Sequence, residues 1–427
     1  MAMRHWTGRL TSLRQVILHK QESYLVKKRF LHGRGSGRGK SRDTPNLIME
    51  DKPVVDAHSL HKPVMVEEVL SFFAPQANQV YIDMTFGGGG HTQALMKCAP
   101  GITVYGLDRD PFAHQIAQKL SLHHKGQLCP LLGKFSEVKD LLSQREVSMV
   151  DGILIDAGCS SFQFDSPERG FALSQDGPLD MRMDANRIPS QPTAADVVNS
   201  LDHVTLTQIL RTYGEESNAK KIAQAIIDYR TNFNTFSSTS ELATVIACCH
   251  THRDAKSNRD KLGRHAHTAT KTFQALRIFV NNELNELAVA VEAAWDLMRP
   301  GGKLAVLTFH SLEDRVVKRS LQGRHVAERG TSLRQKRVES HKDNGAQKWE
   351  VVKRNELCAD DEEINMNPRA RSAKLRTAIA VNKFSSCISS DIQQILQKEG
   401  GQSQTYVQST LHTRALLGEV LLLSLSN

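Results

Sequence analysis

The chain has 427 residues, of which 40% are hydrophobic and 24% charged, and its formal net charge is +9 at pH 7. This hydrophobic content can supply a large buried core, so it excludes a disordered protein and indicates one large domain with an insertion, or two domains. The seven cysteines form no C-x-x-C pair, which is typical of reduced thiols and excludes a disulfide framework.

The first 42 residues hold eleven Lys and Arg against one acid, so they account for the whole net positive charge. Leu10, Leu13 and Ile17 recur at helical spacing among these cations, which predicts a mitochondrial presequence and a location in the matrix. The Gly-Arg-Gly pattern at 33–39 leaves a permanent RNA-binding tail as the alternative. No secretory signal is expected, and the apolar stretch at 415–425 is too short for a membrane span.

Apolar runs alternate with helical patterns along the body of the chain, which predicts a doubly wound, mostly parallel α/β sheet. The expected strands are Val80–Met84, Thr103–Leu107, Leu128–Leu132, Gly152–Ile155 and Leu304–Phe309. The expected helices between them are Val64–Phe73, Thr92–Lys97 and Pro111–Leu122. Near the end, Trp349–Lys353 and Leu375–Val381 are expected to form an antiparallel hairpin that closes the sheet.

About 150 residues separate the fourth and fifth strands, which is far more than a crossover needs and predicts an inserted helical domain. We place this domain at 193–267, with helices at Leu206–Thr212, Ala219–Tyr229 and, behind a capping box at Ser238, Leu242–Ala247. Residues 272–298 are expected to form one long crossover helix that ends at Pro300-Gly-Gly. The main domain therefore comprises 58–192 and 268–382, and the tail at 383–427 has no assigned role.

A glycine run follows the first strand, and an acid ends the second. Gly87–Gly90 can bring the backbone close to a ligand, and Asp108 can accept both hydroxyls of a ribose. This order occurs both in NAD-binding proteins and in proteins that bind S-adenosylmethionine (SAM). Because Gln93 stands where a dinucleotide fingerprint requires glycine, SAM is favoured as the cofactor and an NAD enzyme is the rival.

Several long motifs together make the chain resemble the RsmH/MraW family of SAM-dependent methyltransferases, which modify the N4 amine of a cytidine in small-subunit ribosomal RNA. The resemblance covers about residues 58–382 and, with the N-terminal segment, points to the mitochondrial branch of that family. It implies a seven-stranded class I methyltransferase sheet. The motifs include Tyr81-Ile-Asp-Met-Thr-Phe-Gly87, Asp176-Gly-Pro-Leu-Asp-Met-Arg-Met-Asp184, Thr272-Phe-Gln-Ala-Leu-Arg-Ile278, Phe309-His-Ser-Leu-Glu-Asp-Arg315 and Asn367-Pro-Arg-Ala-Arg371.

The resemblance also implies the residues that contact the cofactor. These are Gly89, Gly90, His91, Asp108, Phe135, Asp156 and Gln163. The family's usual Asp-Leu-Gly-Val-Ser-Ser is here Asp156-Ala-Gly-Cys-Ser-Ser161, which keeps the carboxylate and both serines.

An exocyclic amine needs alignment and a polar acceptor for its proton, and neither a metal nor a covalent step is required. Asp156 is the first candidate for this acceptor, although it could instead be only a cofactor ligand, and His310 is the second. Cys159 follows a glycine rather than the proline expected of a nucleophile that attacks the cytosine ring, so we expect no such role. Four arginines are candidates for contacting the RNA: Arg169, Arg182, Arg369 and Arg371.

The expected partner is mitochondrial small-subunit rRNA within an assembling ribosomal subunit, together with assembly factors. The basic segment 315–337 could track phosphates or could be a solvated loop. Cys248-Cys249-His250 lacks a second ligand pair at the usual spacing, so we expect no metal site. The sequence leaves a homodimer open. It also leaves open a methyltransferase of another substrate and a non-catalytic assembly factor that keeps the fold.

Overall fold

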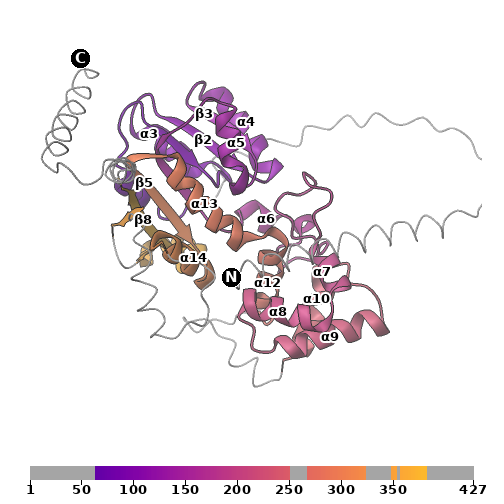
Figure 1. Cartoon of the computed structure of the whole chain (residues 1–427). Coiled ribbons are helices and arrows are strands. Elements are labelled where there is room, and N and C mark those ends of the chain that lie inside the picture. Colours follow the sequence, from indigo (N-terminus) through magenta and orange to yellow (C-terminus); the bar gives the residue numbers. More distant parts are fainter. Residues whose placement is uncertain (1–62, 251–266, 324–347, 353–355, 382–427) are drawn as a thin grey trace, which may run out of the picture. The chain divides into compact units, whose positions relative to one another are not determined.

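The computed structural model describes residues 63–250, 267–323, 348–352 and 356–381 (Figure 1). The sheet runs in the order β3-β2-β1-β4-β5-β8-β6, with β7 paired to β8 beside that path. Its strands are β1 (Val80–Asp83), β2 (Thr103–Asp108), β3 (Leu128–Leu132), β4 (Val150–Asp156), β5 (Met298–Thr308), β6 (Trp349–Val351), β7 (Leu357–Cys358) and β8 (Lys374–Ala380). The first five strands are parallel, and β8 is antiparallel to β5 and β6, so the predicted doubly wound sheet is confirmed.

Helices cover both faces of the sheet, because each central strand carries buried apolar side chains on its two sides. On one face, the core around Tyr81, Val104 and Leu154 includes side chains from α2 (Val66–Phe73), α3 (Gly90–Cys98) and α4 (Pro111–His123). On the other face, the core around Ile82 and Ile153 includes side chains from α5 (Val138–Ser143), α13 (Glu283–Leu297) and α14 (Ser311–Leu321).

The prediction of one continuous crossover helix at 272–298 is wrong. The helix is broken into α12 (Thr270–Asn281) and α13 by Asn282, which adopts a left-handed conformation with φ 55°. Asparagine tolerates this conformation better than most residues. The side chain of Asn281 stabilises the break, since it donates to the carbonyl of Met181 and accepts the N–H of Met183.

Pro300-Gly-Gly follows the helix end that the sequence pattern predicted, since α13 ends at Leu297, one residue before the expected end. Strand β5 begins at once at Met298, so Pro300-Gly-Gly lies inside the strand. The pairing of β5 with β4 is irregular here, since Val150 pairs with Met298 and Gly152 with Lys303, and a proline is tolerated at such an irregularity.

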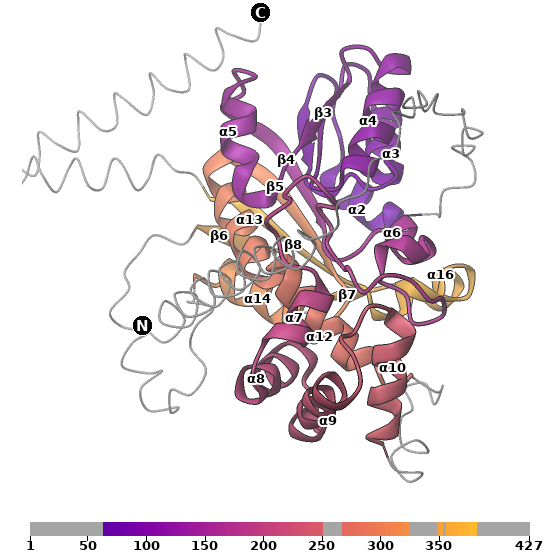
Figure 2. The ribbon, with the colours of Figure 1, turned by 90° about the vertical axis from the view of Figure 1, so that its right-hand side faces the viewer.

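A helical region packs around its own apolar core (Figure 2). Its helices are α7 (Ala194–Ser200), α8 (His203–Gly214), α9 (Ala219–Asn232), α10 (Thr239–Cys248) and α12. The capping box predicted at Ser238 is present, with the side chain of Glu241 reaching back to the N–H of Ser238. This core also includes Phe171, Leu179 and Met181, which precede the boundary predicted at residue 193. The helical region therefore includes part of the loop that follows β4.

None of the described helices is both long and apolar enough to span a membrane. The predicted presequence, the tail at 383–427 and most of the basic segment 315–337 lie outside the described residues, as do His252 and His265, which follow Cys248 in the sequence.

Candidate active site

The glycine loop joins β1 to α3, as the sequence predicts. Gly87 and Gly89 have φ values of 53° and 78°, which favour glycine. A Cβ on Gly89 would lie 2.6 Å from the ring of Phe86, and one on Gly90 would lie 2.7 Å from Pro63. Glycine at 89 and 90 is therefore required by packing against the chain's own side chains. The sequence pattern had instead been interpreted as room for a ligand to approach the backbone.

Asp108 ends β2 beside this loop. Its Oδ2 accepts the N–H of Gly87 at 2.8 Å, and its Oδ1 accepts the N–H of Asp110 at 2.9 Å. Each carboxylate oxygen keeps a lone pair, so the pair of oxygens can still accept the two hydroxyls of a ribose. Burial raises the pKa of Asp108 to about 7, and further donors would favour its charged form.

Asp83 and Thr85 were not among the predicted site residues. Asp83 ends β1, is 1% exposed, and accepts the hydroxyl of Thr92 at 2.8 Å and the N–H of Thr85 at 3.1 Å. The hydroxyl of Thr85 in turn accepts the N–H of Asp156 at 2.6 Å. The signal was visible in the sequence, because Asp83 follows a buried strand just as Asp108 and Asp156 do.

Asp156 ends β4, next to β1. Its Oδ1 is buried and has no hydrogen-bond partner within the described residues. Burial raises the pKa of Asp156 to about 6; His91 opposes this rise, and the acids Asp83 and Glu313 add to it. A buried acceptor without a donor is costly unless a ligand supplies one, so Asp156 marks a binding position.

The three carboxylates Asp83, Asp108 and Asp156 end adjacent strands at one edge of the sheet. This is where open α/β sheets bind their ligands. An acidic edge attracts a cation such as the sulfonium and ammonium groups of SAM, and it would repel the pyrophosphate of a dinucleotide. The residues present therefore fit SAM better than NAD.

Replacing Asp108 with alanine is expected to weaken SAM binding tenfold or more, because each charge-assisted hydrogen bond it makes contributes about 1.5–3 kcal/mol before compensation. The measurement is a calorimetric titration with SAM, with folding checked by circular dichroism. Asp228→Ala on α9 serves as the control, because Asp228 is exposed and accepts a hydrogen bond from the neighbouring side chain of Gln224. Unchanged affinity in a folded Asp108→Ala protein would remove Asp108 from the cofactor site.

Gln163 and Phe135 lie near these strand ends. Gln163 is buried, donates to Asp110 Oδ2 at 2.8 Å and accepts the N–H of Ser160 at 3.2 Å, so both ends of its amide have internal partners. Phe135 begins the short helix η2 (Phe135–Glu137), two residues after Gly133, whose N–H bonds the carbonyl of Asp108 at 2.9 Å. Their contacts with a cofactor stay predictions.

Arg169 and Arg182 have internal partners in this structure. Arg169 pairs with Asp110 at 2.7 Å and donates to the carbonyls of Arg182 and Met183 at 3.1 Å. Arg182 makes two hydrogen bonds to the carboxylate of Asp180, at 2.8 and 2.7 Å. Both arginines thus hold the loop after β4 in place, and their contact with RNA stays a prediction.

A second buried ion pair anchors the same loop. Asp184 is fully buried and accepts hydrogen bonds from Arg109 and Arg187. Burial alone would raise the pKa of Asp184, but Arg109 and Arg187 hold it below its usual value. Arg109, Asp110 and Asp184 were not among the predicted site residues, although Asp184 ends one of the motifs quoted above. The alternating charges of Asp108-Arg-Asp110 were the one sequence signal for Arg109 and Asp110. They do not reveal with which side chains these residues pair.

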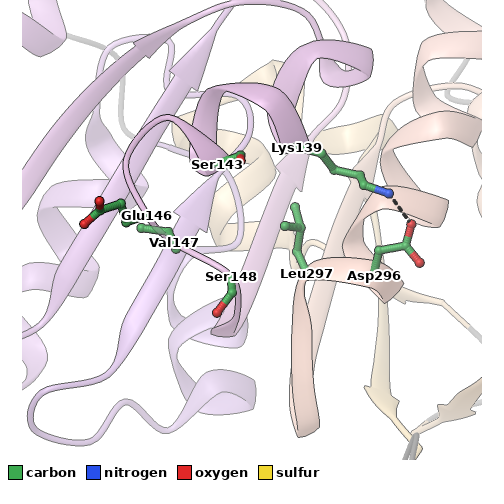
Figure 3. A pocket seen from close by; sticks show the side chains of 7 residues that line it. All are labelled: Lys139, Ser143, Glu146, Val147, Ser148, Asp296 and Leu297. Carbon is green, nitrogen blue, oxygen red and sulfur yellow. Dashed lines mark hydrogen bonds and ion pairs between the residues drawn. The ribbon is translucent and has the colours of Figure 1, made fainter. Parts of the chain in front are cut away.

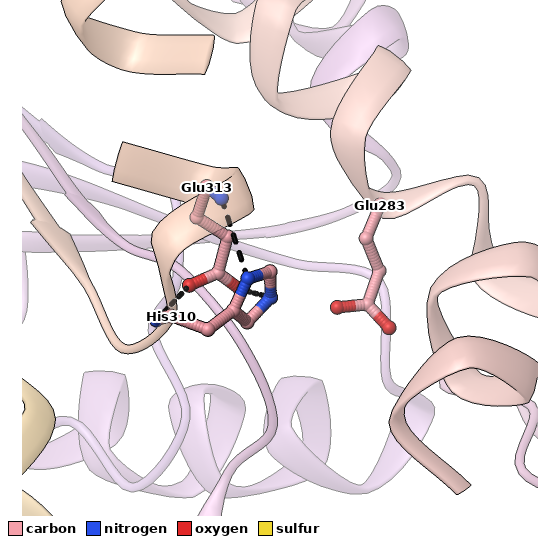
Figure 4. A group of neighbouring side chains, drawn as sticks. All are labelled: Glu283, His310 and Glu313. Atoms are coloured by element: carbon pink, nitrogen blue, oxygen red, sulfur yellow. Dashed lines mark hydrogen bonds and ion pairs between the residues drawn. The ribbon is translucent and has the colours of Figure 1, made fainter. Parts of the chain in front are cut away.

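His310 caps the N-terminus of α14 (Figure 4). Its Nδ1 accepts the N–H of Glu313 at 3.3 Å, so the neutral ring carries its hydrogen on Nε2, which lies 2.8 Å from Glu313 Oε1. No ring lone pair is then left to take a proton from a substrate. This contact favours a structural role, and proton acceptance by His310 stays a prediction.

Glu283, His310 and Glu313 are close enough to hold a metal ion. However, Arg277 bonds both carboxylate oxygens of Glu283 at 2.9 Å, so those ligand atoms already have a cationic partner. Cys159 lies near Arg277, and burial raises the pKa of its thiol to about 12. A thiol that resists ionisation is a poor nucleophile, and the absence of a nucleophilic role for Cys159 stays a prediction.

Arg369 and Arg371 lie in η4 (Pro368–Ser372). Arg369 is exposed, contacts Asp165 at 3.1 Å and lies over the ring of Phe164. Arg371 is half-buried. Arg369 is thus the more accessible of the two candidates for RNA contact, and both assignments stay predictions.

A shallow pocket lies between α5 and the end of α13 (Figure 3). Its rim includes the exposed ion pair between Lys139 and Asp296, 2.7 Å apart. It lies at the amino ends of β4 and β5, whereas the acidic edge lies at their carboxyl ends. This pocket therefore does not belong to the candidate active site.

The chain is similar in sequence to known rRNA methyltransferases. The mouse 12S rRNA N(4)-cytidine methyltransferase METTL15 is 49% identical over 345 residues, which cover 77% of this chain and 85% of the relative. The Ribosomal RNA small subunit methyltransferase H of Hyphomonas neptunium is 42% identical, over 79% of this chain and 93% of its own. A solved rRNA methylase from Streptococcus thermophilus is 10% identical, covers 74% of this chain and 96% of its own, and has a TM-score of 0.29.

The family model described as the MraW methylase family matches residues 58–381. This range contains the acidic edge, the glycine loop and the helical region, and it takes in well over half of the chain. The chain belongs to the MraW methylase family.

Proposed function

We propose that this SAM-dependent methyltransferase transfers a methyl group to the N4 amine of a cytidine in mitochondrial small-subunit rRNA. The family match and the names of the relatives support this substrate. Within the site, the observation that carries the proposal is the buried, unpartnered Oδ1 of Asp156 at the acidic edge.

The N4 amine of cytosine is a poor nucleophile because its lone pair is delocalised into the ring. The bound cofactor supplies an activated methyl group, so the protein has to align the amine and accept its hydrogen bond. Asp156 offers an acceptor that has no competing donor within the described residues. The target base must be unpaired or extruded to reach it, because an exocyclic amine inside a helix is inaccessible.

Mass mapping of modified cytidines tests this function. Purified protein, SAM and small-subunit rRNA should yield N4-methylcytidine, and mitochondria without the protein should lack it. If the rRNA stays unmodified while the protein methylates another substrate, the substrate assignment is wrong. If the protein is instead a non-catalytic assembly factor, its Asp156→Asn variant should support ribosome assembly as well as the unchanged protein does, and neither should methylate the rRNA.

The substrate form is proposed to be an assembling ribosomal subunit rather than naked RNA, with assembly factors as further partners. A homodimer is compatible with this role, and sedimentation of the purified protein would test it. The matrix is the proposed location, supported by the acid-poor, arginine-rich first 42 residues and by the 12S rRNA in the names of the relatives.

Deleting residues 1–42 is expected to abolish mitochondrial import and to leave methylation by the purified protein unchanged, because a presequence acts only in targeting. The measurement combines import into isolated mitochondria with an in vitro methylation assay. A truncated chain that enters mitochondria normally, or that loses affinity for RNA, would instead support the RNA-binding tail.

A further inference from the structure

The imidazole of His91 is held so that only one of its ring nitrogens is free. The side chain is buried, and Nε2 lies 2.9 Å from the carbonyl oxygen of Val64. A carbonyl can only accept, so we assign the hydrogen of the neutral ring to Nε2. Nδ1 of the neutral ring then carries a lone pair.

This free nitrogen faces the candidate catalytic acid. Nδ1 of His91 lies 3.9 Å from Oδ2 of Asp156. When the carboxylate is ionised and the ring neutral, two acceptors face each other across this gap. One additional proton held between the two atoms would satisfy both of them, after an approach of about 1 Å or through one water.

Among the described residues, no second cation acts on the carboxylate of Asp156. Asp83 from β1 and Glu313 from α14 both act on it, and both are acids. Asp83 is held by Thr85 and Thr92, while Glu313 is held by the N–H of Phe309 and by His310. His91 is thus the one group that opposes the rise of the pKa of Asp156.

We propose that His91 is a positioning residue that holds, together with Asp156, the proton lost by the cytidine amine. This role rests on the proposed function. The N4 lone pair forms the bond to the methyl carbon, and the electrons of the carbon–sulfur bond stay on sulfur. The surplus N4 proton passes to the carboxylate of Asp156, is shared between Oδ2 and His91 Nδ1, and leaves to solvent after the product.

The first test is the pH profile of turnover for His91→Gln at saturating SAM. Glutamine can still donate to the carbonyl of Val64 but cannot take up a proton. Since the charged form of His91 lowers the pKa of Asp156, its loss is expected to move the acid limb of the profile to higher pH by about one unit, and turnover at pH 6 to fall about fivefold. At high pH the rate should approach that of the unchanged protein.

His123→Gln is the matched control. His123 is exposed on α4 and its Nδ1 likewise lies near a backbone carbonyl, that of Lys119 at 3.3 Å, but no carboxylate is paired with it among the described salt bridges. Its pH profile should match that of the unchanged protein. An unshifted acid limb in a His91→Gln protein that binds SAM normally would overturn the proposal, because a purely structural His91 would affect only stability or SAM affinity.

The second test does not depend on activity. Nitrogen NMR of labelled histidines should show the hydrogen of the neutral His91 ring on Nε2, and Asp156→Asn should change the signal of Nδ1. A neutral ring with its hydrogen on Nδ1, or an Nδ1 signal that Asp156→Asn leaves unchanged, would overturn the pairing. If NMR shows the pairing of His91 with Asp156 but no RNA is methylated, the proposed function is wrong while the pairing itself is confirmed.

Discussion

Asp156→Asn is expected to lower turnover about a hundredfold or more, with SAM affinity changed little. Asparagine keeps the size and one acceptor oxygen but loses the charge, so it orients the N4 amine less well and cannot take its proton. Because the pKa of Asp156 is raised to about 6, the unchanged protein should also lose activity as the pH falls through that range. The variant should lack this acid limb.

The measurement is single-turnover methylation of small-subunit rRNA, combined with SAM titration of the same variant. If Asp156 is only a cofactor ligand, the affinity for SAM should fall and turnover should recover at saturating SAM. Asp165→Asn is the control, since Asp165 is exposed at the end of α6 (Ser161–Asp165) and contacts Arg369 at the surface. A near-normal saturated rate in Asp156→Asn would exclude the catalytic role.

Asp184→Ala is expected to lower the free energy of unfolding by about 3–5 kcal/mol, because it leaves Arg109 partly buried without its carboxylate. The loop after β4 is tied to the end of β2 through this contact, so the loss should also weaken the wall of the active site. Urea unfolding measures the first effect, and SAM titration the second.

The control for this change is Asp296→Ala. Its ion pair with Lys139 is exposed on both sides, so it should have no measurable effect on unfolding. The pKa of Asp184 is lowered in the folded protein, so its contribution is present above the ordinary aspartate pKa of about 3.9 and is lost as the pH falls through the lower folded value. Equal stability of the two variants at neutral pH would contradict the buried pairing.

The parallel strands were predictable because each is an apolar run long enough to be buried on both faces. Their bounds changed by at most two residues, except that β5 begins six residues earlier than expected. The break at Asn282 was not predictable. The apolar stripe runs on through it, and what stabilises it is the contact of Asn281 with Met181 and Met183, about a hundred residues away. Pro300 marked the end of α13 correctly by local rules, but those rules did not show that β5 begins directly after the helix and contains Pro300.

By itself the sequence determined the order of strands and helices, the acids at the strand ends and the family, because these follow from local periodicity and from motifs of adjacent residues. Only the tertiary structure decided which charges meet. It paired Arg169 with Asp110 and Arg109 with Asp184, and left one oxygen of Asp156 without a donor. Such pairings depend on side chains that are distant in sequence. An unpaired charge becomes energetically costly only when folding buries it.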